Sequence, residues 1–154
     1  MIVGYDVILV IIAIFLQSML INIFPLPFAR VDLLLILSGI YSTRSTVGRA
    51  MAFVFFGNLM MELVYPASPI TGIKTMSALV LAFALHQLAR RVVVKGAAAC
   101  LTVGAYALLV ALGARWLSSL LGFALLPVSI YGYIVFLLST AFLTCLVIGR
   151  IDVQ

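Results

Sequence analysis

Charged residues are scarce in this chain: Asp, Glu, Lys and Arg make up 8% of its 154 residues, against about 25% in an average soluble domain. Hydrophobic residues instead make up 66%. A soluble globule of this size needs a polar surface that these residues cannot supply, and the same composition excludes a disordered chain. The length fits one domain. The sequence therefore predicts an all-α, polytopic membrane protein, with a single transmembrane helical domain over residues 1–154.

Cysteine and histidine are nearly absent, and Cys100, Cys145 and His86 are the complete stock. Two cysteines are too few for a disulfide scaffold. Both lie in apolar runs, where a buried free Cys packs as a small hydrophobic side chain, and we expect that role for them. His86 adjoins Gln87 and a basic cluster, so we expect it at the membrane interface rather than in a proton relay.

Motifs that carry catalysis are also lacking. The chain has no Gly-rich phosphate loop, His-Glu-x-x-His, paired Cys-x-x-Cys or nucleophile elbow. An enzyme would have to recruit Asp32 and Glu62 as its carboxylate pair. The nine Lys and Arg residues are spread along the chain and form no basic stripe for nucleic acid. We therefore expect no enzyme, no catalytic or cofactor-binding residue, no metal site and no nucleic-acid partner.

Six apolar segments fit membrane spans, because about 20 apolar residues cross the hydrocarbon core of a bilayer. The second is short, reaching only about 16 Å. A surface helix is expected over Arg115–Leu126, because its leucines fall on one face. The predicted spans are Val7–Phe24, Val31–Tyr41, Val47–Tyr65, Ile73–Leu88, Val92–Leu112 and Val128–Ile148.

Charge predicts the orientation of these spans. Six crossings place Arg30, Lys74 and Arg115 on one side of the bilayer and six cations on the other. The positive-inside rule assigns the six-cation side, and with it both termini, to the cytoplasm. The side with six cations holds Arg44, Arg49, Arg90, Arg91, Lys95 and Arg150.

Small residues predict where helices pack closely. Gly96, Cys100 and Gly104 recur at i, i+4 and i+8 in the fifth span. This spacing gives the helix a smooth seam that another backbone can approach. We expect packing within the bundle there, rather than an oligomer interface.

Ionisable residues at membrane depth are costly and often functional. Asp32 begins the second span, where we expect it to cap the helix and to pair with Arg30. Glu62 lies near the end of the third span and Lys74 begins the fourth, so the turn between them is expected to bring the two together as a charge pair. Arg30, Asp32, Glu62 and Lys74 are therefore the candidate contact residues for a partner or ligand on the outer side.

Four stretches of the first 90 residues carry a family resemblance. The first span ends with Phe15-Leu16-Gln17-Ser18, and the second begins with Val31-Asp32-Leu33-Leu34-Leu35. The third closes with the stretch from Ala52 to Glu62 (AFVFFGNLMME), and the fourth is preceded by Gly72. The order of these stretches, the chain length and the six expected spans resemble the rod-shape-determining MreD family. The stretch from Val31 is similar to the Pro-acid/amide-Leu-Leu-Leu motif of that family, and the stretch from Ala52 to Glu62 is similar to its Gly-Phe-x-x-Gly-x-x-x-Asp motif. The chain departs from that pattern at Val31, Ala52 and Glu62, where the family often has Pro, Gly and Asp.

The resemblance implies a non-enzymatic scaffold of the bacterial cell-wall elongation machinery, located in the inner membrane. Its partners would be the single-span protein MreC, then RodA and a class B penicillin-binding protein in a larger complex, with MreB indirectly. The vitamin-binding S-components of energy-coupling-factor transporters resemble the same six-helix architecture and leave a small-molecule binder as the alternative. Brief outer loops and a single Trp argue against it. A third interpretation is that the chain is another small membrane protein that acts as a binding partner.

Overall fold

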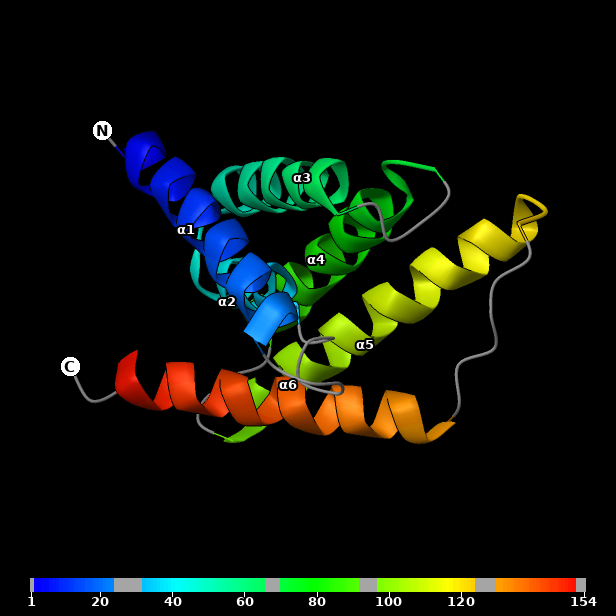
Figure 1. Cartoon of the computed structure of the whole chain (residues 1–154). Coiled ribbons are helices and arrows are strands. Elements are labelled where there is room, and N and C mark those ends of the chain that lie inside the picture. Colours follow the sequence, from blue (N-terminus) through cyan, green and yellow to red (C-terminus); the bar gives the residue numbers. More distant parts are fainter. Residues whose placement is uncertain (1, 24–31, 66–69, 92–96, 124–129, 152–154) are drawn as a thin grey trace.

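The computed structural model describes residues 2–23, 32–65, 70–91, 97–123 and 130–151. Across these residues the chain forms six α-helices and no strand (Figure 1), which confirms the all-α prediction. The helices are α1 (Ile2–Ile23), α2 (Leu33–Arg44), α3 (Val47–Val64), α4 (Ile73–Arg91), α5 (Ala97–Leu120) and α6 (Ile130–Ile151).

Consecutive helices run in opposite directions. Asp6, near the start of α1, contacts Tyr41, near the end of α2, and the last turn of α3 meets the first turn of α4. Gly113 of α5 faces Ser77 of α4, and α6 runs back along α5. The start of α1 and the end of α6 consequently lie on the same side of the molecule (Figure 1).

The shortest helix, α2, lies at the centre of the bundle. Its 12 residues span only about 18 Å, yet it packs against α1, α3, α4 and α5. Gly39 lets α5 approach, because a Cβ there would lie 2.8 Å from Val103 Cγ1. Four other helices thus surround α2 on several sides. Its buried residues are Leu34, Leu35, Ile36, Ser38, Gly39, Ile40 and Ser42.

Helix α6 packs chiefly on α5. Gly104 faces Ala141, and a Cβ built at Gly104 would lie 3.3 Å from that of Ala141. One turn earlier, Cys100 is joined to Cys145 in a disulfide, with 5.2 Å between their Cα atoms. The expectation of two unpaired cysteines was wrong, because their pairing depends on how α5 and α6 align across 45 residues.

The predicted surface helix at Arg115–Leu126 is also wrong over its described part. Residues 115–120 continue α5 without a break, because a lone Gly113 does not end a helix. The helix ends at Leu120, and Gly122 follows with φ +83°. There the Phe123 N–H donates to the Ser118 carbonyl and the Gly122 N–H to the Ser119 carbonyl, which is a Schellman motif.

Within the described parts of the chain, two helices are long and apolar enough on their own to cross a bilayer, at residues 47–64 and 98–120. Shorter apolar stretches occupy Gly4–Leu20, Leu33–Arg44 and Tyr131–Leu146. By length and composition these helices point weakly to membrane association.

Candidate functional site: a buried polar cluster

Glu62 caps a helix other than its own. It is 2% exposed, and its carboxylate accepts from the N–H groups of Gly72 and Lys74, each at 2.9 Å, and of Thr75 at 3.3 Å. The Thr75 hydroxyl donates to it as well, at 2.6 Å. The first N–H groups of a helix lack partners within the helix and favour a nearby anion. The last turn of α3 thus supplies the cap of α4.

Asp32 caps α2 and also holds α4. Its Oδ1 accepts from the Leu35 N–H at 3.1 Å, which is the expected capping role. Its Oδ2 forms an ion pair with the Lys74 ammonium. The predicted Glu62–Lys74 charge pair is therefore corrected: the ammonium of Lys74 meets Asp32, and Lys74 meets Glu62 through its backbone N–H.

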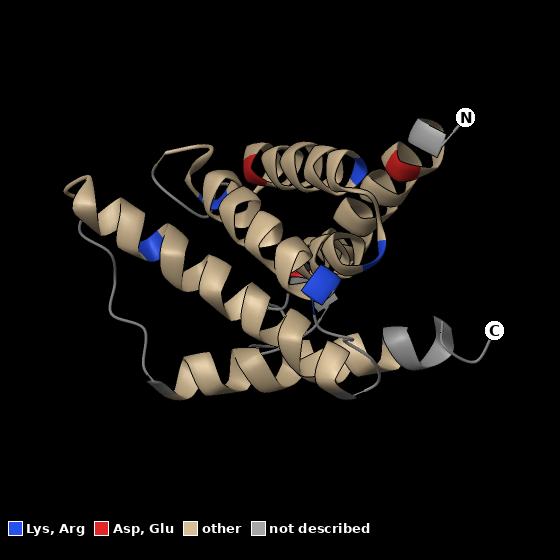
Figure 2. Ribbon diagram, turned by 180° about the vertical axis from the view of Figure 1, so that it is seen from behind, with Lys and Arg blue, Asp and Glu red and all other residues tan. Residues whose placement is uncertain are grey.

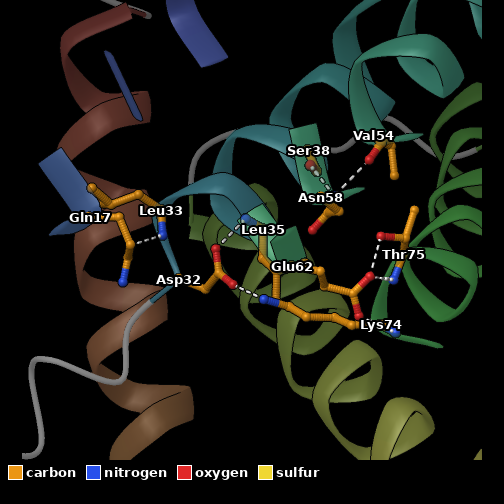
Figure 3. Close-up of polar contacts among 10 residues, drawn as sticks. All are labelled: Gln17, Asp32, Leu33, Leu35, Ser38, Val54, Asn58, Glu62, Lys74 and Thr75. Atoms are coloured by element: carbon orange, nitrogen blue, oxygen red, sulfur yellow. Dashed lines mark hydrogen bonds and ion pairs between the residues drawn. The ribbon is translucent and has the colours of Figure 1, made fainter. Parts of the chain in front are cut away.

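Gln17 adds α1 to this arrangement (Figure 3). It is buried, and its Oε1 accepts from the Leu33 N–H, another of the first donors of α2, at 2.9 Å. One residue on, Ser18 accepts a hydrogen bond from the Tyr65 hydroxyl at 2.5 Å. A side-chain amide such as that of Gln17 inside an apolar run indicates a hydrogen bond to another helix. The sequence does not show which helix that is.

Asn58 lies one turn before Glu62 on α3 and is fully buried. Its Nδ2 donates to Ser38 Oγ at 3.2 Å and to the Val54 carbonyl at 2.9 Å. No hydrogen-bond partner reaches Asn58 Oδ1 among the described residues. No motif in the sequence marks Asn58 or Ser38 as part of such a site.

Taken together, Gln17, Asp32, Asn58, Glu62 and Lys74 form a polar cluster that joins four helices (Figure 3). The Asp32 carboxylate faces the Lys74 ammonium and the N-terminal end of α2, and the Glu62 carboxylate faces the N-terminal end of α4. Each carboxylate therefore has a positive charge or the positive end of a helix dipole beside it. Such an arrangement locks helix ends together. The described residues contain no group of three or more His, Cys, Asp or Glu that could hold a metal ion.

A second polar contact set lies at the opposite end of the bundle. Both carboxylate oxygens of Asp6 accept from Arg49, at 2.7 and 2.8 Å, and one also accepts from the Tyr41 hydroxyl at 2.7 Å. The Tyr41 ring stacks on Phe53 with 4.1 Å between the ring centroids. His86, expected at the interface, is buried here.

Two residues of the predicted set, Arg30 and Gly96, lie outside the described residues. The other predicted residues separate into two places: Asp32, Glu62 and Lys74 meet in the polar cluster, whereas Cys100 and Gly104 face α6. No protein family, curated protein or solved structure matches the chain.

Proposed function

We propose that the chain is a six-span membrane protein of the bacterial inner membrane, with both termini in the cytoplasm. The distribution of its side chains supports this placement. Leu138 and Phe142 of α6 are more than 60% exposed, whereas Asn58 and Glu62 are buried. Lipid accepts apolar side chains on the outside of a bundle and favours polar groups within it.

Within that membrane, the proposed role is an MreD-like, non-enzymatic scaffold that binds an MreC-like single-span protein. RodA and a class B penicillin-binding protein would join the larger complex, and MreB would act indirectly. The hydrogen bonds of the Asp32 and Glu62 carboxylates are the observation that supports this proposal. Both carboxylates accept hydrogen bonds from the N-terminal ends of helices, so they hold the helices of the bundle in fixed positions, as a scaffold requires.

The proposed scaffold presents helix faces rather than a charged rim to its partner. Glu62 is too deeply buried to touch another protein. The exposed apolar faces of α1 and α6 remain as surfaces for a transmembrane helix, since helix association in lipid rests on close packing and a few polar contacts.

Co-purification of the tagged chain from its native membrane, followed by mass spectrometry of proteins and small molecules, tests this function. We expect an MreC-like single-span protein and no bound metabolite. A stoichiometric vitamin or an ATPase module would favour the S-component alternative instead.

The contact face can be tested in the same assay. Phe142→Ala on the exposed face of α6 is expected to reduce recovery of the partner, and Thr144→Ala on its buried face serves as a control of the same helix. Equal recovery with both variants would exclude α6 as the contact face.

A further inference from the structure

The disulfide between α5 and α6 has one buried end and one exposed end. Cys100 is only 4% exposed, whereas Cys145 is exposed. Cys145 follows Phe142 by three residues and adjoins Leu146, and both of these side chains are exposed, so Cys145 lies at the edge of the contact between the two helices. A reactant from outside can therefore reach Cys145 but not Cys100. Exposed disulfides are the ones that act as labile, regulatory or catalytic bonds.

The surroundings of this bond select the kind of reactant that can approach it. Residues 97–114 of α5 and residues 131–146 of α6 include no Asp, Glu, Lys or Arg (Figure 2). Next to Cys100, Leu101 is 65% exposed and adds to the apolar surface. A charged reactant loses hydration at such a surface, and neither helix offers it an opposite charge. A small neutral reactant does not incur this cost.

The position of Cys100 favours it as the leaving group of an exchange reaction. It is the fourth residue of α5, within the first turn, where the positive end of the helix dipole stabilises negative charge. Helix N-termini stabilise thiolates in this way. When a thiolate attacks Cys145, the electron pair of the broken bond consequently passes to a sulfur that can hold it.

We propose that Cys100–Cys145 is a thiol–disulfide exchange site for a small neutral thiol, which enters at Cys145. The thiolate form of the reactant bonds to Cys145 Sγ, the bond to Cys100 breaks, and Cys100 Sγ takes the electron pair and then a proton. A second thiolate bonds to the reactant sulfur of this mixed disulfide, and Cys145 Sγ leaves with the electron pair and takes a proton. Two reactant thiols are thus oxidised to one disulfide, and the protein disulfide is reduced to two thiols.

Reduction of the bond loosens the end of α6. Apolar packing also holds this part of the helix, as where Gly104 faces Ala141. The hydroxyl groups nearby add little, because Ser139 and Thr144 donate to carbonyls of α6 itself. Thr140 Oγ1 has no hydrogen-bond partner among the described residues. The redox state of the disulfide therefore controls how firmly the end of α6 is attached to α5.

Two matched thiols test the reaction on the purified full-length chain in a non-ionic detergent. 2-Mercaptoethanol is neutral and 2-mercaptoethanesulfonate is anionic, and alkylation followed by mass spectrometry counts the protein thiols that each produces. We expect the neutral thiol to reduce folded wild type at least about tenfold faster, because the apolar surface disfavours the anion. The chain denatured in guanidinium chloride is the control, and there the two rates should be similar.

The point of entry is tested on wild type by brief reaction with 2-mercaptoethanol, rapid alkylation with iodoacetamide and peptide mapping. We expect the mixed disulfide on Cys145 and the alkyl group on Cys100. Hydrogen exchange of fully reduced wild type should be several-fold faster over residues 139–146, since cross-link and packing both protect these amides, and unchanged over residues 53–62 of α3. Cys100→Ser/Cys145→Ser is the control, because its exchange should not respond to the thiol.

Four results would overturn the inference. A bond that resists 2-mercaptoethanol in the folded chain, at concentrations that reduce the denatured one, would be a permanent cross-link. Equal rates with the neutral and anionic thiols in the folded chain would contradict selection by the apolar surface. A mixed disulfide on Cys100 would reverse the proposed point of entry, and unchanged exchange over residues 139–146 after reduction would show that the bond does not control α6.

Discussion

The ammonium of Lys74 pairs with the carboxylate of Asp32, 42 residues earlier in the chain. The same lysine donates its backbone N–H to Glu62. One residue at the start of α4 is therefore held by two acids through different atoms, and each acid also caps a helix. This double attachment fixes the ends of α2, α3 and α4 relative to one another.

The ion pair predicts a specific pattern of stability. Lys74→Met is expected to lower the free energy of unfolding by about 3 kcal/mol, because it leaves the Asp32 charge buried without its partner. Asp32→Asn/Lys74→Met should recover most of this loss, since Asn still accepts the Leu35 N–H as a cap. Denaturant unfolding in micelles, followed by circular dichroism, measures Lys74→Met, Asp32→Asn and the double variant. A double variant as unstable as the sum of the single ones would contradict the pairing.

The Glu62 cap predicts a local effect on α4. Glu62→Ala leaves buried N–H groups without an acceptor and is expected to cost about 2 kcal/mol, with faster amide exchange at Lys74 and Thr75. Glu62→Gln keeps one acceptor oxygen and should have the smaller effect. Hydrogen exchange resolved by residue checks this. Protection unchanged at these amides in Glu62→Ala would show that the carboxylate is dispensable for the cap.

The contact between α2 and α5 predicts intolerance at Gly39. An added Cβ there would meet Val103 at 2.8 Å, whereas nothing lies within 4 Å of one added at Gly48. Gly39→Ala is expected to destabilise the bundle by about 1–3 kcal/mol through overpacking. Gly48→Ala, in the first turn of α3, should stabilise it by up to about 1 kcal/mol. Thermal midpoints in the same detergent compare the two, and equal shifts would sink the prediction.

The disulfide predicts that a reductant acts on α5 and α6. Reduction should lower the stability of wild type by up to about 4 kcal/mol, the usual range for a cross-link that closes a long loop. Cys100→Ser/Cys145→Ser should match reduced wild type and respond to no reductant. Thermal unfolding with and without dithiothreitol measures this, together with alkylation to count free thiols. Two reactive thiols in the untreated protein would refute the bond.

Local sequence patterns predicted several helix positions closely. The predicted starts at Val47 and Ile73 agree with α3 and α4, because turn residues separate two apolar runs there. Asp32 was recognised as a cap because its position before an apolar run favours that role. These features depend on residues close together in the chain, which is why the sequence alone reveals them.

Contacts between helices were predicted less well. The partner of Lys74 and the Cys100–Cys145 bond depend on how each helix is rotated about its axis, which composition does not determine. The extension of α5 was missed because leucines on one face of Arg115–Leu126 fit a surface helix as well as the end of a long one. The hydrogen bond of Asn58 to α2 and the close approach of α5 at Gly39 both depend on the positions of neighbouring helices, which the sequence does not specify.

The central position of α2 has a consequence for the order of assembly during synthesis. Gln17, which binds the start of α2, is made before that helix, but His86, which binds its end, is made 44 residues after Ser42. Until α4 leaves the ribosome, the Ser42 carbonyl lacks its native partner. The short helix therefore reaches its final environment only after its successors arrive, and truncation of the chain before residue 86 would leave the end of α2 without this contact.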